Sequence, residues 1–275
     1  MLNPLRAFLN IGIRTSGVTL SGRRSFLRGR QRILAVMPLS GSQMAHTDLV
    51  FQALKEALSS QGCSRLQTRV VIGDDMVRYF MVHPTAKTST LADCQALATT
   101  HFETLYSQKA HGWQVQGLWH PSLPFLAYAI PDCILHALTR VSRLLHLPLN
   151  SVLPCFINSW RQWNRRLGDD AWFGNVVDKT LCLAMVSDSR LHAVSTVMIP
   201  SETHAAWFPA YLEREASRVG LPFPRSVQFC GNIPPVLLKP GPNYPFCSRI
   251  DMGKPNAFHP HFPDEGKVLK NAQVR

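Results

Sequence analysis

Residues 172–231 constrain the fold of this 275-residue chain more than any other stretch. Five segments with a regular pattern follow one another there: short apolar runs at 172–178, 180–186 and 191–199, a helical period over 203–219, and a fourth short run at 226–230. Short apolar runs bounded by turn residues favour β-strands, and a period of 3.6 residues favours a helix. The stretch therefore predicts a β-β-β-α-β unit, and with it an α/β fold.

The preceding residues, 32–167, also alternate between short apolar runs and amphipathic helical patterns. We expect this segment to form a first half of the fold and residues 168–231 to form a second half. Residues 232–275 are rich in proline and lack strand or helix periodicity, which predicts a C-terminal tail. Residues 1–31 are basic and predict a disordered arm, so we expect the first half to lack its leading strands.

The net charge of +12 is unevenly distributed along the chain. Residues 1–47 hold seven arginines and no acidic residue, while the remainder holds 22 basic and 17 acidic residues, a net charge of +5. Such an arm can bind nucleic acid or anionic lipid. Its composition also fits a transit peptide or a disordered leader. The candidate contact residues in the arm are Arg23, Arg24, Arg28 and Arg30.

A second candidate contact site lies in the predicted helix over residues 156–167. Trp160 and Trp163 alternate there with Arg161, Arg165 and Arg166. Aromatic and basic side chains together can form a platform for nucleic-acid bases. At helical spacing, tryptophans more often belong to the core while the arginines face solvent, and we favour that interpretation.

No catalytic motif is present in the sequence, so we predict no catalytic, cofactor-binding or metal-binding residues. Phosphate-binding loops need glycines because the backbone must approach phosphate oxygens closely. The turn Asp178-Lys179 between two central strands has no glycine, and we interpret Gly73-Asp74-Asp75 as an ordinary turn between strands. The seven cysteines include no C-x-x-C pair, which predicts reduced, buried thiols in a cytoplasmic protein.

Several short motifs, taken in order, carry a resemblance to a known family. They include residues 70–84, Trp113-x-Val115, Asn158-x-Trp160-x-x-Trp163-Asn164, Trp172-Phe173 and residues 212–215. In this order they resemble the actin-like assembly proteins of bacterial type IV pilus and type II secretion systems. The resemblance implies a ribonuclease H-like, actin-like fold of two β-β-β-α-β-type halves. In this chain the nucleotide loops are degenerate.

The resemblance also implies a function. We expect a non-catalytic scaffold or docking protein that binds protein partners of a membrane-anchored assembly at the cytoplasmic face of the inner membrane. We expect neither ATP hydrolysis nor a bound cofactor, and no segment is apolar enough to span a membrane. The alternatives are a nucleic-acid-binding protein that uses the arginine-rich arm and an actin-like protein that retains weak nucleotide binding.

Overall fold

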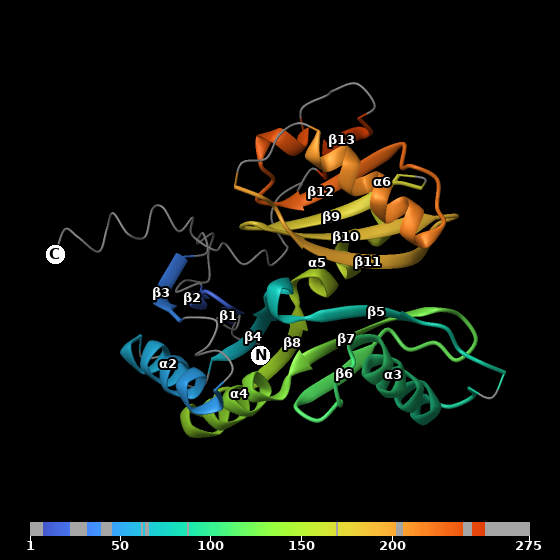
Figure 1. Ribbon diagram of the computed structural model, residues 1–275. Helices are drawn as coiled ribbons and strands as arrows, with labels where there is room; N and C mark the ends of the chain where they lie inside the picture. Colours follow the sequence, from blue (N-terminus) through green and yellow to red (C-terminus); the bar gives the residue numbers. More distant parts are fainter. Residues whose placement is uncertain are drawn as a thin grey trace, which may run out of the picture. The chain divides into compact units, whose positions relative to one another are not determined.

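The computed structural model describes residues 8–22, 32–39, 46–61, 63, 66–86, 88–168, 170–201, 206–238 and 244–250. Its chain divides into two compact units (Figure 1). One contains the described residues of Met1–Met76 and Cys133–Cys155, and the other contains the described residues of Val77–Asp132 and Phe156–Ala257. This division groups residues 77–131 with the second sheet, whereas the sequence analysis assigned them to the first half.

The first unit is built on a five-stranded sheet of order β3-β2-β1-β4-β8. Its elements are β1 (Phe8–Arg14), β2 (Gly17–Gly22), β3 (Arg32–Pro38), α2 (Thr47–Ser60), β4 (Gln67–Ile72), the 3₁₀ turn η1 (Asp74–Met76), α4 (Asp132–Leu145) and β8 (Leu149–Pro154). The first three strands are antiparallel, while β4 and β8 run parallel to β1. Helices α2 and α4 lie side by side, joined by an ion pair between Arg140 and Asp48.

The strands β1 and β2 lie inside the segment that the sequence analysis predicted to be a disordered arm. Leu9, Ile11 and Ile13 alternate along β1, and Val18 and Leu20 continue the pattern in β2; all five are buried. This alternation of apolar residues is typical of β-strands. The sequence analysis gave more weight to the arginines on either side than to this pattern. Because β1 and β2 are present, the expectation that the first half lacks its leading strands was wrong. Residues 23–31 lie outside the described residues.

The second unit contains the predicted β-β-β-α-β unit, which is confirmed. Its elements are β9 (Trp172–Val177), β10 (Thr180–Ser187), β11 (Arg190–Met198), α6 (Trp207–Val219), β12 (Ser226–Gly231), η3 (Pro235–Leu238) and β13 (Phe246–Arg249). The sheet order is β11-β10-β9-β12-β13, so it repeats the connectivity of the first sheet. The elements η3 and β13 fall within the segment that the sequence analysis predicted to be a C-terminal tail. A parallel strand of four residues is too short to show periodicity, so no pattern in the sequence indicated β13.

Apolar side chains on both faces hold the second sheet in place. Phe208 and Leu212 of α6 pack against one face, which includes Val176 and Phe229. On the other face lies α5 (Cys155–Trp163), followed by the 3₁₀ turn η2 (Asn164–Arg166). The Trp160 ring of α5 lies 5.9 Å from the ring of Phe173 in β9. The core therefore lies on both sides of β9.

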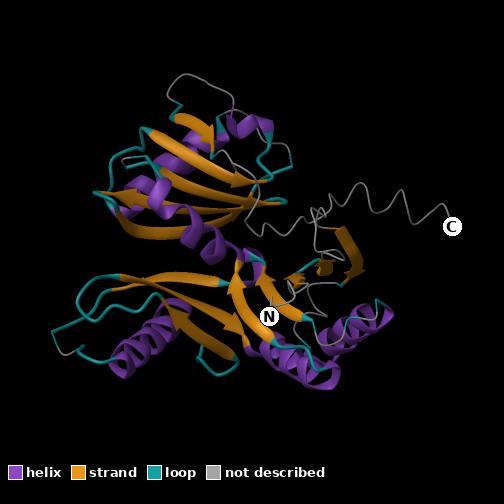
Figure 2. Ribbon diagram, turned by 180° about the vertical axis from the view of Figure 1, so that it is seen from behind, coloured by secondary structure: helices purple, strands orange, loops and turns teal. Residues whose placement is uncertain are grey.

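A smaller antiparallel sheet of order β5-β7-β6 is inserted between β4 and α4 (Figure 2). It consists of β5 (Arg78–Val82), β6 (Trp113–Gly117) and β7 (Phe125–Pro131), with α3 (Leu91–Tyr106) packed on one face. Phe80 and Phe102 form the centre of that contact, with rings 6.0 Å apart. In the described part of the chain, no helix is both long and apolar enough to cross a membrane.

Candidate functional site

Each five-stranded sheet presents the same local arrangement, at the end of its first strand. In the first unit, the chain leaves β4 at Gly73, whose N–H donates to the Ile13 carbonyl of β1 at 2.7 Å. In the second unit, the chain leaves β12 after Gly231, and the Asn232 N–H donates to the Val176 carbonyl of β9 at 2.8 Å. In each unit this crossing lies beside the turn that joins the first two strands. The two turns therefore occupy equivalent positions in the two sheets.

The first hairpin turn, Thr15-Ser16, is bound by a carboxylate of the same chain. The Thr15 N–H donates to Asp75 Oδ2 at 2.9 Å, and the Thr15 hydroxyl donates to the same oxygen. Asp75 belongs to η1, which is closed by a hydrogen bond of 3.0 Å from the Met76 N–H to the Gly73 carbonyl. A carboxylate is an anion with the hydrogen-bonding preference of a phosphate oxygen. The N–H that could serve a phosphate is therefore already engaged.

Glycine at position 73 makes this contact possible. A Cβ at that position would overlap Asp75 Oδ1 and lie 2.6 Å from Cγ of Arg14. Asp74, the neighbouring carboxylate, is buried. The predicted turn between two strands is confirmed, since residues 73–76 connect β4 to β5, and Asp75 of this turn also binds the β1–β2 hairpin. The sequence pattern Arg-Thr-Ser-Gly17 at the hairpin could have indicated this turn, because glycine often accommodates the positive φ that Gly17 adopts here, +143°.

The second hairpin turn, Asp178-Lys179, is closed by different groups. Asp178 has φ of +52°, and the Lys179 carbonyl accepts from the Ile199 N–H at 2.6 Å. The Lys179 ammonium lies 3.4 Å from the Ser201 hydroxyl. This turn keeps the β9–β10 pair tight without the glycine that close approach to a phosphate needs.

The tryptophans and arginines that the sequence analysis considered together differ in their exposure to solvent. Trp160 and Trp163 are 8% and 2% exposed, so neither ring offers a face on which a base could stack. Arg161, Arg165 and Arg166 are exposed, and the Arg166 guanidinium lies 5.4 Å from the centre of the Trp163 ring. The core interpretation of the tryptophans is confirmed. A partner contact through the three arginines stays a prediction.

The other predicted contact residues, Arg23, Arg24, Arg28 and Arg30, lie outside the described residues. Among the residues that are described, no three His, Cys, Asp or Glu side chains lie together as metal ligands would. The seven cysteines are free thiols, five of them buried. Burial raises the pKa of the Cys247 thiol, one of the two half-buried ones, to about 12.

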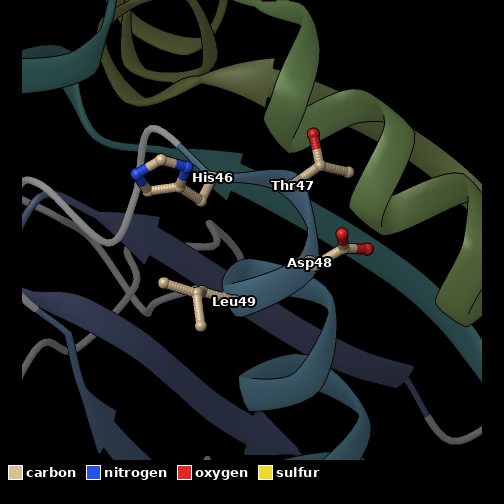
Figure 3. Close-up of a pocket in the computed structure, with 4 residues that line it drawn as sticks. All are labelled: His46, Thr47, Asp48 and Leu49. Carbon is tan, nitrogen blue, oxygen red and sulfur yellow. The ribbon is translucent and has the colours of Figure 1, made fainter.

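A shallow depression lies at the start of α2, lined by His46, Thr47, Asp48 and Leu49 (Figure 3). The Asp48 carboxylate there is paired with Arg140, whose guanidinium also lies 4.2 Å from the centre of the Phe51 ring. His46 precedes the helix, and its side chain makes no capping hydrogen bond. The carboxylate at this helix start takes the place that an anion would need, so the depression offers no anion site.

Comparison with known proteins provides independent evidence for the fold. No protein-family model and no curated protein sequence matches this chain. A Bacteroides thetaiotaomicron protein of unknown function with an actin-like ATPase fold aligns over 83% of both chains, with 10% identity and a TM-score of 0.56. The cytoplasmic domain of EpsL, an inner-membrane component of the Vibrio cholerae type II secretion system, aligns over 98% of this chain and 95% of its own, with 11% identity and a TM-score of 0.53.

A PilM–PilN type IV pilus biogenesis complex aligns over 76% of this chain and 65% of its own, with 13% identity. Its TM-score of 0.46 is too low to support an inference about this chain. The two stronger likenesses, together with the repeated sheet order, establish the fold as actin-like and ribonuclease H-like. The predicted fold class is confirmed. At identities near one residue in ten, the likeness extends to the fold and not to the activity.

Proposed function

We propose that this protein is a non-catalytic actin-like scaffold in the assembly of a secretion or pilus apparatus, acting at the cytoplasmic face of the inner membrane. The observation that carries the proposal is the Asp75 carboxylate bound to the turn of the first hairpin. An ATPase of this fold would need the same N–H to face a phosphate. A second anion at Thr15 would meet the negative charge of Asp75 at close range, which opposes binding.

Two further observations support a docking role. The likeness to the EpsL cytoplasmic domain covers nearly the whole of both chains, so the same body of the fold is present. That protein is described as part of an inner-membrane secretion system. The protein partners of this chain would then be components of a membrane-anchored assembly. The insert formed by the β5-β7-β6 sheet and α3 offers a separate surface for such a partner.

ATP hydrolysis by the purified full-length chain tests the catalytic part of the proposal. We expect a rate equal to that of buffer with magnesium alone, both for the wild type and for Thr15→Val, which removes the hydroxyl at the hairpin. Hydrolysis well above that background, reduced by Thr15→Val, would overturn the proposal. A hydrolysis rate unaffected by Thr15→Val would indicate a contaminating ATPase and is resolved by testing Lys179→Ala at the second hairpin in the same way.

A second candidate function is nucleic-acid binding through the basic N-terminal segment, motivated by its seven arginines in residues 1–47. Removing residues 1–31 would not test this, because it would also remove β1 and β2 from the sheet. The better variant replaces Arg23, Arg24, Arg28 and Arg30 by glutamine. Binding that falls steeply with salt in the wild type and is lost in this variant would favour the second function.

A further inference from the structure

Strand β6 forms one outer edge of the β5-β7-β6 sheet (Figure 1), and its backbone points hydrogen-bonding groups outward there. Just beyond the end of β6, the Leu118 N–H donates to the Leu126 carbonyl next to β7 at 2.8 Å. Hydrogen bonding alternates along an antiparallel strand, so the even-numbered residues of β6 bond to β7. The N–H and C=O groups of Val115 and Gly117 therefore face away from the sheet, where no described strand pairs with them.

This edge lacks the features that protect the other sheet edges of the described chain. An open edge is a template for another strand, so proteins place charged residues, prolines or β-bulges there. Strands β3 and β8 each end in a proline and pair across a register shift, and β11 also pairs across a register shift. Strand β13 ends at Arg249, and β5 begins at Arg78. Strand β6 has the sequence Trp-Gln-Val-Gln-Gly and pairs with β7 without a shift, so it has none of these features.

The two faces of β6 differ in polarity. Trp113 and Val115 pack with α3 on one face of the sheet. Gln114 and Gln116 alternate with them along the strand and lie on the opposite face. Gln114 is exposed, and the rest of the strand is partly exposed. None of residues 112–119 is charged.

These properties fit a second copy of the same strand. Two β6 strands related by a two-fold axis run antiparallel, and the residues closest to the axis meet their own equivalents. A charge at that position would lie opposite a like charge, which is destabilising, and β6 carries no charge. The axis is perpendicular to the sheet, so the apolar face of one copy continues as the apolar face of the other.

The outward groups select one register for this pairing. With Gln116 on the axis, Val115 of each copy pairs with Gly117 of the other, and every outward N–H and C=O group of these two residues gains a partner. With Val115 on the axis, Gly117 would pair with Trp113, whose N–H already donates to the Ala110 carbonyl at 2.9 Å. The Gly117 carbonyl would then stay unpaired. In the favoured register the two Gln116 side chains are close neighbours, and an amide both donates and accepts.

We propose that the chain forms a symmetric dimer in which two β6 strands pair antiparallel about Gln116. The pairing joins two three-stranded sheets into one continuous sheet. A contact of one short strand per copy is smaller than the roughly 1,200 Å² of a stable interface, so the dimer is weak in free solution. It forms more readily where several copies are held on one assembly, because their effective concentration is raised there. The inference goes beyond the proposed scaffold role and does not depend on it.

Sedimentation velocity of the full-length chain tests the proposal. Protein concentrations from about 1 μM to about 1 mM cover micromolar to millimolar dissociation constants, and the wild type should shift from monomer to dimer within that range. Gln116→Lys and Gln116→Glu should each weaken dimerisation by about fivefold, because each places two like charges across the axis. An equimolar mixture of the two variants should dimerise at least as well as the wild type, because opposite charges then meet.

Two further measurements locate the contact. Hydrogen exchange at the Val115 and Gly117 amides should slow as the protein concentration rises, whereas the Gln114 and Gln116 amides, which bond to β7, should not change. Val115→Pro removes one outward N–H from each copy and keeps the bonds to β7, so it should abolish dimerisation. Its unfolding temperature shows whether the variant is folded. Gln52→Lys, which adds a charge to the exposed side of α2, is the matched control and should dimerise like the wild type.

Three outcomes would overturn the proposal. The first is a chain that stays monomeric up to about 1 mM, which would leave the β6 edge to a strand of a different protein. The second is a dimer that both Gln116 variants form as readily as the wild type. The third is weakened dimerisation in each variant that mixing does not restore. Should Val115→Pro fail to fold, the charge exchange at Gln116 still decides between these results.

Discussion

Replacing Asp75 by alanine gives the sharpest test of how the first hairpin is occupied. The substitution removes the acceptor of two hydrogen bonds from Thr15, one from its N–H and one from its hydroxyl. A hydrogen bond to a charged group contributes about 1.5–3 kcal/mol when it is shielded from water. Thr15 is exposed, so water replaces part of each bond, and we expect the free energy of unfolding to fall by about 1–2 kcal/mol.

A double-mutant cycle isolates the contact from other effects of the substitution. Thr15→Val removes the hydroxyl and keeps the N–H, and should cost about 0.5–1 kcal/mol. Urea unfolding of the two single variants and the double variant should give a coupling energy of similar size. Glu56→Ala, which removes an exposed charge from α2 in the same unit, is the matched control and should stay within about 0.5 kcal/mol of the wild type.

The same variant also tests whether Asp75 occupies an anion site. Once the carboxylate is removed, the Thr15 N–H is free to bind inorganic phosphate, which would then stabilise the folded chain. We expect phosphate to raise the unfolding temperature of Asp75→Ala relative to a chloride solution of equal ionic strength, and to leave that of the wild type unchanged. A coupling energy of zero, or an equal response of both proteins to phosphate, would refute the reasoning.

Three further predictions concern stability and thiol chemistry. Hydrogen bonds from backbone N–H groups, first that of Ser89, lower the pKa of Asp93 to about 2, so its ionised form stabilises the chain above the unfolded pKa of 3.8. Urea unfolding should show that the advantage over Asp93→Asn present at about pH 6 is lost at about pH 2; an advantage unchanged by pH would contradict this. Gly231→Ala should cost about 2–4 kcal/mol in the same assay, because its Cβ would overlap a main-chain carbonyl at φ of +93°, and Gly112→Ala, at φ of +89° with open space around its Cβ, should cost only about 1 kcal/mol. With its pKa raised to about 12, Cys247 should resist iodoacetamide in the native chain at about pH 8 and react after denaturation, as followed by mass spectrometry of its peptide; rapid native labelling would contradict its burial.

The second half of the fold was predictable because its pattern is local. The strands β9, β10 and β11 follow one another with short turns, so each apolar run signals its strand without reference to distant residues. The burial of Trp160 and Trp163 was predictable for the same reason, since helical spacing placed them on an apolar face. These signals depend on neighbours within a few residues, and the sequence contains them in full.

The first hairpin was not predicted because the sequence analysis gave more weight to the arginine content of the segment than to its alternation of apolar residues. Seven arginines in residues 1–47 favoured a disordered arm, although Leu9, Ile11 and Ile13 alternate as a strand should. Strand β1 depends for its stability on pairing with β4, which is more than fifty residues away in the sequence. That parallel pairing leaves no local signal, because the two runs are joined by a helix and two other strands.

The sequence by itself determined the class of fold, the second half-domain and the absence of glycine at the Asp178-Lys179 turn. Only the tertiary structure decided that the chain has two sheets of the same order and that Asp75 binds the turn at Thr15. The physical reason is sequence distance. Asp75 and Thr15 are 60 residues apart, and they are brought together by the pairing of β1 with β4, which the apolar periodicity of either strand does not specify.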